Sequence, residues 1–151
     1  MSLDLQLALA WFCFVATFSP GPNNIMLMSS GARFGLRLTV PHLFGIVTGL
    51  VSWVFIAGAG VGAVVHALPA AQIGFQIAAA VYLTWLAWKL ARAGAPTANP
   101  GAERPVNWLQ AAGFQWVNPK AWSITIAGVS LYATGQGVAA VVWVAATFAA
   151  V

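Results

Sequence analysis

The sequence has very few charged residues. Only 5% of its 151 residues are Asp, Glu, Lys or Arg, whereas a typical soluble domain has about 25%. Its only acidic residues are Asp4 and Glu103, while 61% of the chain is hydrophobic and the mean hydropathy is +0.86. These values exclude an ordinary soluble domain and predict an integral membrane protein in contact with the lipid bilayer.

Other classes of site are also excluded by what is scarce. Cys13 is the only cysteine, so the chain has no disulfide framework and no thiolate metal site. The few cations cannot form a nucleic-acid groove, and the apolar runs contain no set of residues typical of an intramembrane enzyme. We therefore expect no enzyme activity, no metal, no cofactor and no nucleic-acid partner.

Long apolar runs predict an all-α fold, because lipid offers no partners for an open sheet and the runs lack the alternation of barrel strands. A helix needs about 20 residues to cross the hydrocarbon layer. The sequence predicts five such segments: Leu5–Gly31, which is broken, Leu38–Val64, Ile73–Leu90, Trp108–Leu131 and Val138–Val151.

The basic residues predict the orientation in the membrane. They cluster after the first segment, at Arg33 and Arg37, and around the third loop, at Lys89, Arg92 and Arg104. Loops rich in Lys and Arg face the cytoplasm. We therefore expect the N-terminus to lie outside and residues 94–107 to form a cytoplasmic linker between a first repeat, 1–93, and a second, 108–151.

Both repeats begin with a helix that contains Asn and Pro. The first carries "SPGPNN" at residues 19–24 and the second carries "WVNPKAW" at 116–122. Two halves with an odd number of spans run in opposite directions, which is the inverted-repeat plan of many secondary transporters. The pattern predicts three spans in each half, with the last helix missing from this chain.

The break in the first segment is formed by Pro20, Gly21, Pro22, Asn23 and Asn24. The prolines lack N–H groups, so carbonyls one turn earlier lose their helical donors. The exposed backbone groups and the asparagine amides would then bind a substrate or line a gate. The alternative is an ordinary turn at the membrane interface.

Three residues of the second break, Asn118, Pro119 and Lys120, are the matching candidates. Lys120 lies near the bilayer midplane if the segment begins at Trp108, and an ionisable group at that depth usually marks a pathway. The alternative is that Lys120 extends to the cytoplasmic surface. Lys120 and His42 are the candidates for proton coupling, although a lone histidine is more often a hydrogen-bonding helix residue.

Small residues four positions apart allow helices to approach closely. Gly45 and Gly49 have this spacing in "GIVTG". We expect them, with Gly31 and Gly35, to serve helix packing.

The stretches "SPGPNNIMLMSSGARFGLR", "HLFGIVTG" and "WVNPKAW" together resemble the LysE/RhtB family of bacterial inner-membrane amino-acid exporters. The resemblance implies a multi-pass protein of the inner membrane that exports an amino acid or a derivative, driven by the proton motive force. It also implies that a homodimer is one candidate for the assembly. It assigns the substrate site or gate to the residues of the two breaks.

The sequence departs from that family in two respects. Members usually have a sixth span, so the alternative to an exporter is a truncated, non-transporting remnant or a half-assembly that needs a partner helix. Family members that export basic amino acids tend to carry an acidic residue in the second span, where this chain reads "GIVTGLVSW". A neutral substrate is therefore favoured.

Overall fold

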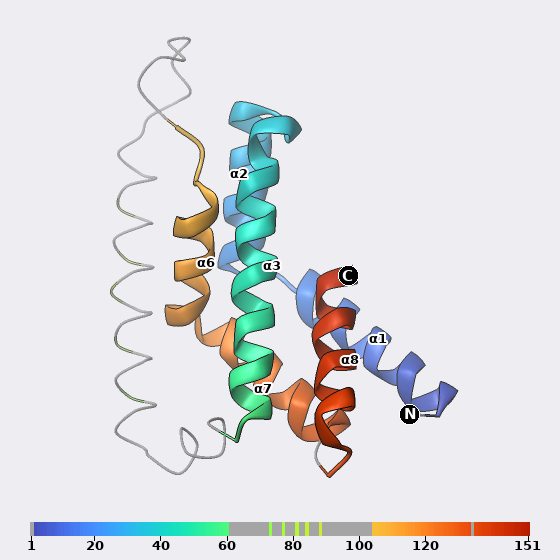
Figure 1. Cartoon of the computed structure of the whole chain (residues 1–151). Helices are drawn as coiled ribbons and strands as arrows, with labels where there is room; N and C mark the ends of the chain where they lie inside the picture. The colour runs from blue at the N-terminus through green and yellow to red at the C-terminus, as the bar shows by residue number, and fades with distance from the viewer. Residues whose placement is uncertain are drawn as a thin grey trace.

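The computed structural model describes residues 2–60, 104–133 and 135–151, together with Ile73, Ile77, Val81, Thr84 and Trp88. Every regular element in these ranges is a helix, as the fold prediction requires. The helices labelled in Figure 1 are α1 (Leu3–Phe18), α2 (Pro22–Phe34), α3 (Leu36–Gly58), α6 (Trp108–Val117), α7 (Pro119–Tyr132) and α8 (Gly137–Ala150).

The first predicted segment is broken where the sequence indicated. Helix α1 ends at Phe18, Ser19 is extended, and α2 begins at Pro22 with Gly21 as its N-cap. Proline suits the first position of a helix because its missing N–H would have no intrahelical partner there. The axes of α1 and α2 meet at 64°, so the two helices point in clearly different directions.

Helix α3 is the centre of the described structure. It contacts α2, α6, α7 and α8, and Figure 1 shows it running upright between α6 and α8. The turn from α2 into α3 is made by Gly35, whose φ of 77° favours glycine. Helices of both broken segments therefore pack against α3.

Two predicted segments differ from the observed helices. The second was expected to continue to Val64, but α3 ends at Gly58 and Ala59 and Gly60 form a turn. The fourth, Trp108–Leu131, is two helices that separate at Asn118. The cause is Pro119, which removes a backbone donor and keeps the residue before it out of the helical region.

Of the third predicted segment, only Ile73, Ile77, Val81, Thr84 and Trp88 belong to the described residues, and each is helical. Most of the predicted linker, 94–107, lies outside the described ranges. The division into two repeats therefore stays a prediction, as does the inverted orientation of the halves.

Apolar side chains from four helices form the main core. Leu9 and Cys13 of α1 meet Val54 of α3, Ile126 of α7 and Val144 of α8. A second cluster joins α3 to the second broken segment through Ile46, Leu50, Ala111 and Ala121. These two clusters pack the helices around the breaks, since close van der Waals contact is a main source of helix association in a bilayer.

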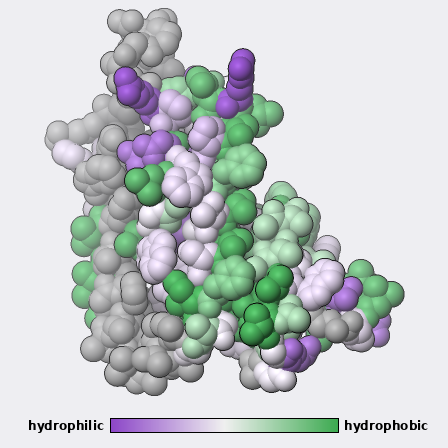
Figure 2. All heavy atoms as spheres, in the orientation of Figure 1, coloured by the Kyte–Doolittle hydropathy of each residue, from purple (hydrophilic) through white to green (hydrophobic). Residues whose placement is uncertain are grey.

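One described helix, α3, is long and apolar enough to cross a membrane, and the bent pair α1 and α2 passes the same test as one segment. Figure 2 shows hydrophilic side chains protruding at the end where α2 meets α3. This turn carries the exposed Arg33 and Arg37, which matches the polar loop expected after the first segment.

Candidate functional site

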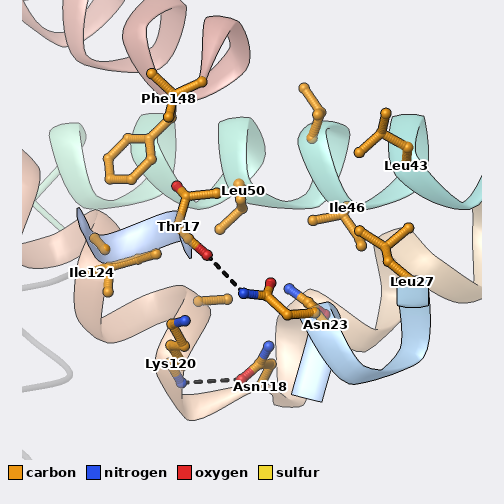
Figure 3. A pocket seen from close by; sticks show the side chains of 15 residues that line it. Thr17, Asn23, Leu27, Leu43, Ile46, Leu50, Asn118, Lys120, Ile124 and Phe148 are labelled. Carbon is orange, nitrogen blue, oxygen red and sulfur yellow. Dashed lines mark hydrogen bonds between the residues drawn. The ribbon is translucent and has the colours of Figure 1, made fainter. Parts of the chain in front are cut away.

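A pocket of about 90 Å³ lies between the two helix breaks. Figure 3 shows its polar side chains, from the ends of α1, α2 and α7, facing apolar side chains of α3. Its polar lining residues include Thr17, Asn23, Asn24, Asn118 and Lys120. This volume is small compared with the volumes of about 300–1,000 Å³ that are usual for sites of drug-sized ligands.

The exposed carbonyls at the end of α1 are bound by Asn24. Its Nδ2 lies 3.2 Å from Thr17 O, 3.4 Å from Phe18 O and 3.1 Å from Ser19 O. These carbonyls have no helical donors because α1 stops at Phe18. Asn24, in the first turn of α2, thus donates hydrogen bonds across the break to the terminal carbonyls of α1.

Lys120 approaches the same helix end from the other half of the chain. Its Nζ donates to Ser19 O, and the residue lies in the first turn of α7. A cation is favourable at a helix C-terminus, where the helix dipole is negative. Gly21 allows this approach, because a Cβ there would lie 2.9 Å from Lys120 Cδ and 3.1 Å from its Nζ.

Asn118 connects α6 to α7 and is 1% exposed. Its Oδ1 accepts a hydrogen bond of 3.1 Å from the Lys120 backbone N–H and so caps α7. Its Nδ2 is buried and has no hydrogen-bond partner among the described residues. A buried donor without a partner is costly, so this amide is well suited to bind a ligand in the pocket.

Thr17 is a site residue that the sequence analysis missed. It lines the pocket from the last turn of α1, and its Oγ1 is buried without a hydrogen-bond partner in the described part of the chain. A threonine in an apolar run carries little sequence signal, because its hydroxyl usually bonds to a carbonyl of its own helix.

Asn23 is paired with a second missed residue, Gln115 of α6. Asn23 Nδ2 donates to Gln115 Oε1 at 2.8 Å, and Gln115 Nε2 donates to Asn23 Oδ1 at 3.1 Å. Gln115 is 0% exposed. The one signal in the sequence was an uncharged amide inside the apolar stretch "GFQWV", because such a group must find a partner when buried.

The structure does not bring His42 into this group. His42 is 1% exposed, lies on α3 and is absent from the pocket lining. Neither ring nitrogen has a hydrogen-bond partner among residues that the structure describes. It lies one turn before Ile46, which does line the pocket.

Gly45 and Gly49 lie where α3 meets α6. A Cβ at Gly45 would lie 2.6 Å from Ala111 Cβ, and one at Gly49 would lie 2.6 Å from Gln115 Cβ. Two non-bonded carbon atoms do not approach this closely, so both positions require glycine in this packing. A Cβ at Gly31 or Gly35 would meet no described atom within 4 Å, which gives no support to a packing role for those two.

Among the described residues, no Asp or Glu side chain lines the pocket. In the described ranges, no group of three or more His, Cys, Asp or Glu residues could hold a metal ion. The polar groups of the pocket are thus amides, a hydroxyl, carbonyls and one ammonium.

Comparison with known proteins places this arrangement in a family. The family described as LysE type translocator matches residues 14–151. The chain belongs to this family. It is thus a member of a family of membrane efflux translocators and not of enzymes.

Several curated proteins are similar to this chain. A protein of Klebsiella pneumoniae subsp. pneumoniae named cysteine/O-acetylserine efflux protein is 30% identical over 134 residues, which cover 89% of this chain and 66% of that protein. Proteins of the same name from Escherichia coli strain K12 and Shigella sonnei are 32% identical over 136 residues, covering 89% of this chain and 67% of theirs. The chain spans about two thirds of the length of these relatives. No solved structure matches it.

Proposed function

We propose that this protein exports a small neutral amino acid, or a derivative such as an O-acetylated one, across the bacterial plasma membrane. The observation that carries the proposal is a small pocket between two helix breaks that the Lys120 ammonium shares with two buried polar atoms, Thr17 Oγ1 and Asn118 Nδ2. Neither atom has a hydrogen-bond partner among the described residues. The similar cysteine/O-acetylserine efflux proteins support this substrate class.

The substrate carboxylate binds Lys120 and Asn118. In the described structure the Lys120 ammonium donates to the neutral carbonyl of Ser19. A carboxylate is a stronger acceptor for an ammonium than a carbonyl is. Asn118 Nδ2 supplies a second donor to the same carboxylate, and Thr17 Oγ1 accepts from the substrate ammonium.

The apolar wall of the pocket selects a neutral side chain. Ile46, Leu50, Ile124 and Phe148 form this wall. A lysine or arginine substrate would bring a second positive charge beside Lys120, and no Asp or Glu side chain of the described lining balances it. Such an uncompensated charge is unfavourable away from water.

Transport follows from movement of the two broken segments relative to each other. In inverted-repeat transporters a central site between interrupted helices becomes accessible from each side in turn. The proton motive force drives the cycle, with Lys120 and His42 as candidate proton carriers and the N-terminus outside. Assembly as a homodimer is compatible with this scheme.

Efflux from preloaded bacteria tests the proposal. Cells that express the chain are loaded with labelled cysteine, O-acetylserine, threonine, leucine or lysine, and efflux is followed with and without a proton uncoupler. We expect uncoupler-sensitive efflux of a small neutral compound and none of lysine. Absence of efflux from a well-inserted chain would contradict the proposal and favour a non-transporting component that needs a partner helix.

A further inference from the structure

We propose that Gln115 is a positioning residue for substrate binding, which sets the orientation of the Asn23 amide toward the pocket. This inference rests on the proposed function. Gln115 does not line the pocket, whereas Asn23 does. The two amides form a closed pair of hydrogen bonds, 2.8 Å and 3.1 Å long, between residues of α2 and α6 that are 92 positions apart in the chain.

The surroundings of Gln115 determine which way its amide faces. Its Nε2 also donates to Ala111 O at 3.1 Å. A carbonyl oxygen can only accept, so the Gln115 NH₂ group must face Ala111 and its oxygen must face the other way. The Gln115 amide therefore has one favourable orientation.

Two residues of α3 hold Gln115 in place. Trp53 Nε1 donates to Gln115 O at 3.1 Å, and Gly49 leaves the space that the Gln115 side chain fills. Gln115 is thus fixed from its backbone and along its side chain. A buried side chain with this many contacts has little freedom to adopt another rotamer.

The orientation passes from Gln115 to Asn23. Because Gln115 presents its oxygen to Asn23 Nδ2 and its NH₂ to Asn23 Oδ1, the Asn23 amide cannot turn over without losing both bonds. Each NH₂ group has two hydrogens, and Gln115 takes one of those on Asn23. Asn23 lines the pocket, so this fixed orientation of its amide would present the second N–H to a substrate carboxylate or ester oxygen.

Without Gln115, Asn23 would satisfy its amide in other ways and would bind substrate in only some of its orientations. Such a loss of preorganisation weakens binding without removing a group that contacts the substrate. The expected signature is a higher half-saturating substrate concentration with a nearly unchanged maximal rate.

Efflux kinetics of Gln115→Leu test this inference. We expect the half-saturating internal concentration to rise about tenfold, while the maximal rate per inserted protein stays within about twofold. Gln110→Leu is the matched control, because Gln110 lies on the same helix and its side-chain oxygen accepts an exposed local hydrogen bond from the Asn107 backbone N–H. This control should leave both quantities unchanged.

The exchange variant Asn23→Gln with Gln115→Asn keeps two facing amides and protects the test against a folding defect. It should recover most of the affinity lost in Gln115→Leu at equal membrane abundance. An unchanged half-saturating concentration in Gln115→Leu, with active unsubstituted protein, would overturn the positioning role alone. Absence of efflux from the unsubstituted chain would overturn the proposed function, and with it this inference.

Discussion

The two helix breaks use similar residues, but the protein satisfies their polar groups to different degrees. At the first break, Asn24 and Lys120 donate to the carbonyls that end α1. At the second break, Asn118 caps α7 with its oxygen, while its Nδ2 has no partner in the described structure. The polar groups of the first break are thus bound mainly by the protein, whereas the second break has a buried donor that we propose binds the ligand.

The two breaks also depend on each other. Lys120 of the second segment binds the end of α1, and Asn23 of the first segment binds Gln115 near the end of α6. A change in the distance between the segments must therefore alter both contacts. The Asn23–Gln115 pair has two hydrogen bonds, whereas Lys120 makes one side-chain contact that a carboxylate can replace, so we expect the lysine contact to open first.

Lys120→Met should have the largest effect, because it removes the charge shared by the first break and the substrate. We expect efflux to fall by about 100-fold, since hydrogen bonds to charged groups are worth up to about 3 kcal/mol. Labelled-substrate efflux per inserted protein measures it. Arg104→Met is the control, because Arg104 is exposed and outside the pocket; an equal loss in that variant would show that net charge, and not the site, matters.

Gly49→Ala tests the support behind the second break. Its Cβ would occupy the space of the Gln115 side chain, and such overpacking usually costs about 1–3 kcal/mol. Thermal unfolding in detergent should show a clearly lower midpoint. Gly31→Ala is the matched substitution without a described neighbour, and it should be neutral or stabilising by up to about 1 kcal/mol; similar midpoints for the two variants would contradict the packing argument.

Asn118→Ser separates the two uses of Asn118. Serine retains a helix cap for α7 but cannot supply the Nδ2 donor, so stability should change little while substrate affinity falls about tenfold. Asn118→Ala should show the same affinity loss together with about 1 kcal/mol of lost stability. If the serine variant and the unsubstituted chain have the same half-saturating substrate concentration, the Asn118 amide does not bind the substrate.

The positions of the breaks could be predicted from the sequence, because proline acts locally. Pro22 begins α2 and Pro119 begins α7, and each follows directly from a missing N–H and a fixed φ. The partners at the breaks could not be predicted in this way. Contacts such as Lys120 with Ser19 and Asn23 with Gln115 join residues about a hundred positions apart, and only the packing of the helices brings them together.

The roles expected for Asn23 and Asn24 show the same limit. Both were expected to bind a substrate or line a gate, and in the structure Asn24 binds the α1 carbonyls while Asn23 pairs with Gln115. An amide serves a ligand or the backbone equally well, so residue type alone does not decide between them. What decides is which donors remain without a partner after folding.

Thr17→Val should have the smallest effect and sharpens the comparison most. Thr17 belongs to the first break, yet its Oγ1 has no partner among the described residues. Valine has nearly the same shape, and removing a buried hydroxyl without a partner should leave stability equal or slightly higher. If the hydroxyl binds the substrate, the half-saturating concentration should rise about threefold, which is about 0.6 kcal/mol, and Thr17→Ser should restore it. Efflux kinetics with unchanged affinity in Thr17→Val would mean that the Thr17 hydroxyl does not contact the substrate and that, of the first break, only Asn23 is left as a candidate for recognition.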